Sequence, residues 1–156
     1  MLRLILIAIA MQEIAGKTAV VTGAASGIGL ALSRRLGSDG MQVMMAEVEE
    51  PALAAAANSL AADGVEVATC VTDVSDADSV EALARATLDR FGAVHVVCNN
   101  AGIGGGGLAW ETPLETWHWV VRVDLFGVVH GIRSFVVADR YRRAADGRNP
   151  QLAPMT

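Results

Sequence analysis

Short runs of apolar and β-branched residues alternate along this chain with longer segments whose apolar residues recur every three or four positions. The short runs predict buried strands, and the longer segments predict helices with one apolar face. We expect strands at 18–22, 42–46, 65–71 and 94–98. We expect helices at 28–37, 51–62, 76–91 and 114–132. Strands that alternate with helices indicate an α/β fold with a parallel sheet and right-handed crossovers.

Residues at two of the predicted helix starts have the character of capping groups. Ser75 precedes the helix after the third strand, where its hydroxyl can accept a backbone N–H. Thr112 and Glu115 have the spacing of a capping box at the start of the last helix. We therefore expect both side chains to cap these helices.

The regular pattern occupies only the middle of the chain. Residues 1–15 contain an apolar run that is too short for a transmembrane helix or an ordinary signal peptide. We interpret this segment as an N-terminal extension, with Met11 as the natural start. Residues 16–138 carry the pattern of one domain, whereas 139–156 are polar and are expected to be a disordered tail.

Composition narrows the class of function. The net charge of −5 argues against a nucleic-acid-binding surface. The hydrophobic fraction of 53% suits strands that are buried on both faces, and no segment is expected to enter a membrane. Cys70 and Cys98 lie in apolar runs, as reduced core residues of a cytoplasmic protein would. His95 and Cys98 would point to opposite faces of one strand, so we predict no metal site.

A glycine-rich turn, T-G-A-A-S-G-I-G at 22–29, joins the first predicted strand to its helix. Gly23 and Gly27 would let the backbone turn tightly and approach a phosphate, and Gly29 would let the helix pack closely. The N–H groups and the positive dipole end of the helix would then face a diphosphate. A glycine-rich turn without a ligand is the alternative. A triphosphate-binding loop is excluded because Ile28 stands where a lysine is required.

Three later segments accompany this turn in a recognisable order. Glu47 follows the second strand, Asp73-Val74 follow the third, and N-N-A-G at 99–102 follows the fourth. With the motif T-G-x-x-x-G-x-G, this arrangement over 16–137 resembles the N-terminal, cofactor-binding part of the short-chain dehydrogenase/reductase family. The resemblance implies an incomplete Rossmann-type parallel sheet with flanking helices and strand order 3-2-1-4. It also implies an NAD(P)-dependent oxidoreductase that moves a hydride between nicotinamide and an alcohol or carbonyl carbon.

The resemblance also assigns a cofactor site. Glu47 would accept hydrogen bonds from the adenosine ribose, and Asp73 would meet the adenine amino group. NAD is favoured over NADP, because a carboxylate repels a 2′-phosphate and Ser26 stands where NADP-preferring members often carry a basic residue. Glu47 as an exposed loop acid and Asp73 as a helix-terminal acid are the alternatives. The residues expected at the cofactor are Gly23, Ser26, Gly27, Ile28, Gly29, Glu47, Asp73, Val74, Asn99, Ala101 and Gly102.

The catalytic residues of the family have no counterpart in this sequence. Members of the family exchange a proton with the substrate through a tyrosine hydroxyl, whose pKa is lowered by a lysine four residues later. A serine upstream polarises the substrate oxygen. Tyr141 is the only tyrosine, but Ala145 stands four residues after it, and the only lysine is Lys17. We therefore expect a chain that is truncated before its catalytic half and has no catalytic residue of its own.

Asp124 departs from the family, which usually has an asparagine at this place. It is either a buried carboxyl at a functional site or a drifted residue in a protein that is no longer catalytic. The alternative function is accordingly a non-catalytic dinucleotide-binding or dimerisation module. An intact relative would act on a small alcohol or ketone, and the long last helix would support a homo-oligomer.

Overall fold

The computed structural model describes residues 14–145, with side chains to residue 136, and its centre is a parallel sheet of four strands. The strand order is β3-β2-β1-β4, which confirms the predicted order. The bounds are β1 (Thr18–Thr22), β2 (Gln42–Glu47), β3 (Val67–Val71) and β4 (Val96–Cys98). β3 begins later than its apolar run predicted, because the Val65 N–H donates to the Leu60 carbonyl at the end of the preceding helix.

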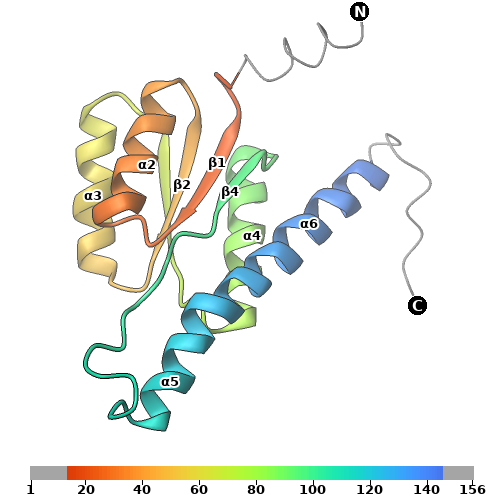
Figure 1. The fold of residues 1–156 in the computed structure, drawn as a ribbon. Coiled ribbons are helices and arrows are strands. Elements are labelled where there is room, and N and C mark those ends of the chain that lie inside the picture. The colour runs from red at the N-terminus through yellow and green to blue at the C-terminus, as the bar shows by residue number, and fades with distance from the viewer. Residues whose placement is uncertain (1–13, 146–156) are drawn as a thin grey trace, which may run out of the picture.

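Helices cover both faces of this sheet (Figure 1). Helices α2 (Gly27–Ser38) and α3 (Glu50–Ala62) lie on one face, and α4 (Ala77–Phe91) and α6 (Gly127–Ala145) lie on the other. Successive strand residues face opposite sides. Val20 thus packs in the core under α4, whereas Val21 packs in the core under α3. This arrangement explains the unbroken apolar runs of β1 and β2, which are buried on both faces.

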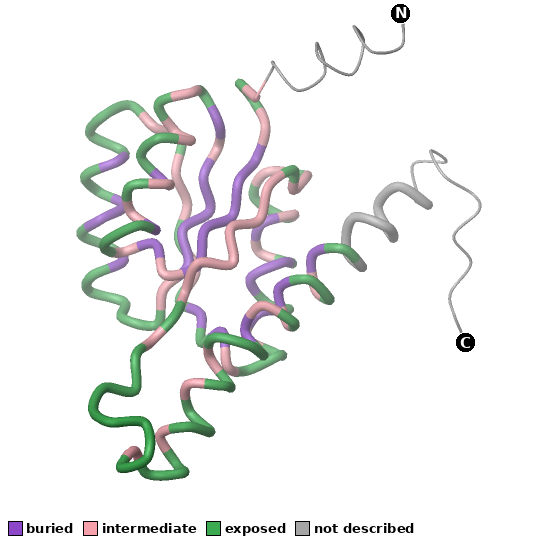
Figure 2. Tube along the Cα trace, in the orientation of Figure 1, coloured by how far each residue is buried: buried purple, intermediate pink, exposed green. Residues whose placement is uncertain are grey.

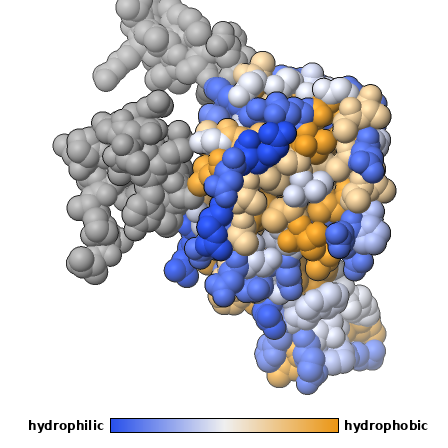
Figure 3. Space-filling view, turned by 180° about the vertical axis from the view of Figure 1, so that it is seen from behind, coloured by the Kyte–Doolittle hydropathy of each residue, from blue (hydrophilic) through white to orange (hydrophobic). Residues whose placement is uncertain are grey.

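The two edge strands are less buried than the two central ones. Figure 2 shows β1 and β2 buried along their length, while β4 is only partly buried. Val71 of β3 is half exposed. Figure 3, a view from the opposite side, shows apolar residues at the surface among polar ones. Within residues 14–145, each edge strand pairs with a single neighbour.

Both predicted caps are wrong in detail. The N-cap of α4 is Asp76, whose carboxylate accepts the Asp78 N–H at 3.1 Å, whereas Ser75 lies one residue earlier and donates its own N–H to Asp73. The last helical segment begins after Pro113 with no side-chain cap. The Thr112 hydroxyl instead donates to the Leu108 carbonyl at 3.0 Å. Thr112 therefore stabilises the preceding loop and not the helix.

The predicted long helix is interrupted by a π-helical turn. It consists of α5 (Leu114–Val121), η1 (Arg122–Phe126) and α6, which runs to Ala145 and so extends past the predicted domain boundary at Ala138. A π-helical turn shifts the faces that precede it relative to those that follow, and such turns are frequent at functional sites. The segments 1–13 and 146–156, which hold most of the predicted extension and tail, lie outside the described residues.

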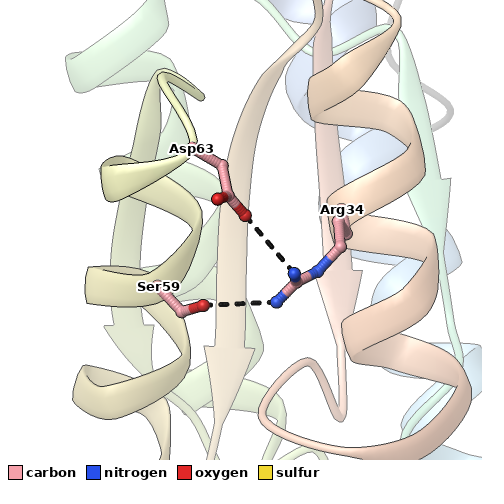
Figure 4. Close-up of polar contacts among 3 residues, drawn as sticks. All are labelled: Arg34, Ser59 and Asp63. Carbon is pink, nitrogen blue, oxygen red and sulfur yellow. Dashed lines mark hydrogen bonds and ion pairs between the residues drawn. The ribbon is translucent and has the colours of Figure 1, made fainter.

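Arg34 joins the outer surfaces of α2 and α3 (Figure 4). Its guanidinium donates to Asp63 at 3.3 Å and to Ser59 at 3.2 Å. All three side chains are exposed, so this link contributes about 0–1 kcal/mol. Arg35 pairs at 2.8 Å with Asp39, the C-cap residue of α2. Both arginines are therefore engaged along α2 and away from its N-terminus.

Candidate functional site

The loops after the four parallel strands meet at the carboxyl edge of the sheet, where ligands bind in open α/β folds. A cavity of about 530 Å³ opens there. It is lined by Gly23, Ser26, Gly27, Ile28, Gly29, Glu47, Val48, Thr72, Asp73, Val74, Ser75, Asn100, Ala101, Gly102, Ile103, Trp119 and Val123. Every strand of the sheet thus contributes a segment to one cavity, and α5 and η1 add a side wall.

The glycine turn forms the floor of this cavity because its backbone leaves no room for side chains. Gly23 has φ +66° and lies so close to the next loop that a Cβ would stand 2.8 Å from the Ala101 Cα. Gly27 has φ +51° and opens onto the cavity, with nothing within 4 Å of a Cβ. A Cβ at Gly29 would overlap the Gly23 carbonyl, so Gly29 allows α2 to start directly on the turn. The first N–H groups of α2 consequently lie at the cavity.

Thr22 and Asn100 connect the glycine turn to the loop after β4. The buried Thr22 hydroxyl donates to the Cys98 carbonyl and accepts the N–H groups of Asn100 and Ala101 at 3.0 and 3.1 Å. The Asn100 amide donates to the Thr22 carbonyl at 2.9 Å. A partly buried hydrogen-bond network of this kind fixes the two loops relative to each other.

The structure brings the predicted cofactor residues together, with the exception of Asn99. All of the others line the cavity. The Asn99 side chain instead lies against α6, where a Cβ added at Gly131 would overlap its amide. The neighbouring Asn100 lines the cavity in its place. Asn100 belongs to the same N-N-A-G motif, so the motif indicated the correct loop but not which asparagine faces the cavity. Trp119 and Val123 were missed because nothing in the sequence shows which face of the last helix turns to the cavity.

The cavity is acidic. Its only charged lining residues are Glu47 and Asp73, and no lysine, arginine or histidine is among the residues that line it. One Glu47 carboxylate oxygen accepts the Val48 N–H at 2.9 Å, which holds the carboxylate at the end of β2. Asp73 accepts the Ser75 N–H at 2.8 Å, and the Asp73 N–H donates to the Ser79 hydroxyl oxygen at 3.1 Å. Both carboxylates are thus positioned by short backbone contacts.

Asp124 is exposed, so of the two alternatives for this position the buried carboxyl is excluded. It lies in the π-helical turn, and its carboxylate accepts the Ile103 N–H at 2.9 Å. Six residues later, the His130 Nδ1–H donates to the Val74 carbonyl at 2.9 Å. The helix therefore holds two of the cavity loops by their backbone atoms, and Asp124 has a defined structural role.

The two cysteines are free and partly buried. Burial raises the pKa of the Cys98 thiol, which keeps it protonated at neutral pH and makes it a poor nucleophile. No cluster of metal-ligating side chains occurs in the part of the chain that the structure describes. Among the helices of residues 14–145, none is long and apolar enough to span a membrane.

Residues 17–146 match the family model for short chain dehydrogenases. The chain belongs to the short-chain dehydrogenase family. It is 48% identical over 122 residues to 1-deoxy-11-beta-hydroxypentalenate dehydrogenase of Streptomyces arenae, covering 77% of this chain and 43% of that protein. It is 46% identical over 121 residues to the enzyme of the same name from Streptomyces avermitilis, covering 76% and 45% of the two chains.

Solved structures of short-chain dehydrogenases have the same fold. A short-chain dehydrogenase/reductase from Burkholderia phymatum in complex with NAD superposes with TM-score 0.79 at 47% identity, over 81% of this chain and 45% of that one. Actinorhodin polyketide ketoreductase with NADPH gives TM-score 0.78 at 37% identity, over 84% and 49%. This short-chain dehydrogenase therefore spans about half the length of the relatives it matches.

Proposed function

We propose that this chain is the NAD-binding part of a short-chain dehydrogenase. The observation that carries the proposal is the cradle at Gly23 and Gly27, where positive φ angles and the absence of Cβ atoms leave backbone at the N-terminus of α2 open to the cavity. Such a surface fits a diphosphate, because helix N-terminal N–H groups and the helix dipole favour anions. The cavity volume of about 530 Å³ is also in the range of small-molecule sites.

Individual residues of the cavity have separate roles in this proposal. Gly23, Ser26 and Gly27 would surround the diphosphate, and Glu47 would accept hydrogen bonds from the adenosine ribose hydroxyls. Asp73 and Val74 would lie beside the adenine. Bound NAD would supply a carbon that accepts or donates a hydride. NAD is favoured over NADP because Glu47 and Asp73 are the only charges that line the cavity.

Catalysis in the whole protein would need residues beyond those of this cavity. None of its lining residues is a tyrosine or a lysine. Tyr141 lies in α6, and Ala145 stands four residues after it where the family has its lysine. We therefore propose that the chain alone binds the cofactor but does not turn over an alcohol or a ketone. Hydride transfer between NAD and such a substrate is the proposed activity of the intact relative.

Calorimetry and a turnover assay on the purified chain test this proposal together. We expect saturable heat of NADH binding, with weaker binding of NADPH, and no NAD-dependent oxidation across a panel of alcohols. Unchanged thermal unfolding of the folded chain at saturating NADH and NADPH would exclude the dinucleotide site, since a ligand of the native state must stabilise it. Turnover by the chain alone would exclude the proposed division between binding and catalysis.

We also propose that the last helix mediates self-association. Its exposed apolar residues include Val121, Leu125, Val129, Ile132 and Val136, and so many apolar side chains on one element are costly to leave in water. Sedimentation is expected to show a dimer that Ile132→Glu converts to a monomer. Arg133→Glu, a charge change at the next exposed position, is the control and should leave the dimer intact. A monomeric parent chain at micromolar concentration would refute the proposal.

A further inference from the structure

Trp119 occupies an unusual place for a tryptophan. It lies on α5, lines the large cavity at the carboxyl edge of the sheet, and is 54% exposed. A large aromatic side chain that remains half exposed beside a cavity often marks a ligand contact. We infer that Trp119 is a contact residue for the adenine base of the bound dinucleotide. This inference rests on the proposed function of the cavity.

The helix contacts place Trp119 on the side of the cavity that is formed by the loop after β3. Gly127 and His130 both touch Val74, since a Cβ at Gly127 would lie 3.0 Å from a Val74 methyl and His130 donates to the Val74 carbonyl. Val123, one turn before Gly127, packs in the same core cluster as Val74 and lines the cavity. Trp119 precedes Val123 by one further turn. The indole therefore extends the Val74–Val123 wall towards solvent.

The chemistry of this wall fits a flat, neutral base. Val74 and Val123 supply an apolar surface, and the half-exposed Val48 adds a further apolar side chain at the end of β2. The charged lining residues are both carboxylates, so a second phosphate is disfavoured on this side. An aromatic face that remains open to such a volume can stack on a purine at little entropic cost, because a tryptophan has few rotatable bonds.

The other two tryptophans provide matched controls. Trp117 lies two residues earlier on the same helix but lines a separate cavity of about 200 Å³ beneath the glycine-rich loop 105–107. Trp110 is 80% exposed and lines neither cavity. Variants that retain a single tryptophan therefore report on one environment each. W110F/W117F retains Trp119, and W110F/W119F retains Trp117.

Fluorescence titration of these variants tests which end of the dinucleotide meets Trp119. ADP-ribose carries the adenine and the diphosphate, whereas nicotinamide mononucleotide carries the other end. We expect NAD and ADP-ribose to quench W110F/W117F strongly, and to leave W110F/W119F nearly unchanged. Quenching of W110F/W117F by nicotinamide mononucleotide but not by ADP-ribose would overturn the assignment to adenine.

Affinity measurements on truncated side chains provide the second readout. W119A is expected to weaken NAD and ADP-ribose binding on the order of tenfold, as loss of a base-stacking aromatic does elsewhere. W119F, which retains an aromatic face, should bind within roughly threefold of the parent. W117A is the control and should bind as the parent does.

The outcomes separate this inference from the proposed function. If the parent chain binds NAD but W119A and W117A bind it equally well, Trp119 is not a base contact, and the dinucleotide site stands. If the parent chain binds neither NAD nor ADP-ribose in the calorimeter, the proposed function fails, and the inference fails with it. Loss of binding in W119A together with retention in W119F and W117A supports both.

Discussion

Alanine at Gly23 is expected to weaken NAD binding by on the order of 100-fold, a loss as large as the loss of rate that a displacement of about 1 Å causes in preorganised catalytic sites. The added Cβ would stand 2.8 Å from the Ala101 Cα, so the glycine turn and the loop after β4 must separate. The φ of +66° adds strain of about 1–2 kcal/mol for an L-residue. Isothermal calorimetry measures the first effect, and urea denaturation measures the second.

Two further glycines distinguish strain from crowding. Gly64 has φ +83° with nothing within 4 Å of a Cβ and lies outside the cavity, so Gly64→Ala should lose only the strain energy and retain full NAD affinity. Gly27 has the same open surroundings but lines the cavity. Gly27→Ala should therefore unfold like Gly64→Ala but bind NAD less tightly. If Gly23→Ala bound NAD as well as Gly64→Ala does, the close approach of the two loops would have no functional role.

The features that could be predicted from the sequence are those determined by local pattern. The runs at β1 and β2 are largely apolar because both faces of these strands are buried. The turn at Gly23 could be predicted because its positive φ favours glycine. Their order along the chain then leaves few topologies for a parallel sheet with right-handed crossovers. The resemblance to the family supplied the order 3-2-1-4 and the expected cofactor residues; the order is confirmed, and those residues line the cavity with the exception of Asn99.

Features that depend on contacts between distant segments could not be predicted in the same way. The Ile103 N–H donates to the Asp124 carboxylate, and the two residues are 21 positions apart in the sequence. No periodicity in the sequence predicts a hydrogen bond over that separation. The π-helical turn at Arg122–Phe126 has an ordinary apolar helix pattern in the sequence. Asn99 and Asn100 are chemically identical, and only the packing against Gly131 determines which one turns away from the cavity.

These contacts make the last helix part of the cavity at the carboxyl edge as well as a cover for the sheet. It holds the Ile103 N–H through Asp124 and the Val74 carbonyl through His130, and it contributes Trp119 and Val123 directly. A change in the position of this helix would therefore be transmitted to two loops of the cavity. Self-association through its opposite face would stabilise the same arrangement.

Replacing Glu47 with glutamine is expected to reduce the preference for NAD over NADP by about 100-fold. The carboxylate lines the cavity at the end of β2, and its replacement removes a charged acceptor for the ribose hydroxyls together with the repulsion of a 2′-phosphate. The first loss weakens NAD binding, and the second strengthens NADP binding. Calorimetric titration of both cofactors against the same protein gives the ratio directly.

The neighbouring Glu49 shows whether the position of the carboxylate or the total charge of the protein determines the preference for NAD over NADP. Glu49 is exposed and does not line the cavity, so Glu49→Gln removes the same charge without changing the site. We expect the ratio of its NAD affinity to its NADP affinity to equal that of the parent chain. The repulsive part of the Glu47 effect should also weaken as salt rises from 0.1 M towards 1 M, since the Debye length falls from about 10 Å to about 3 Å. Equal ratios for Glu47→Gln and Glu49→Gln would mean that the carboxylate at the end of β2 does not select the cofactor.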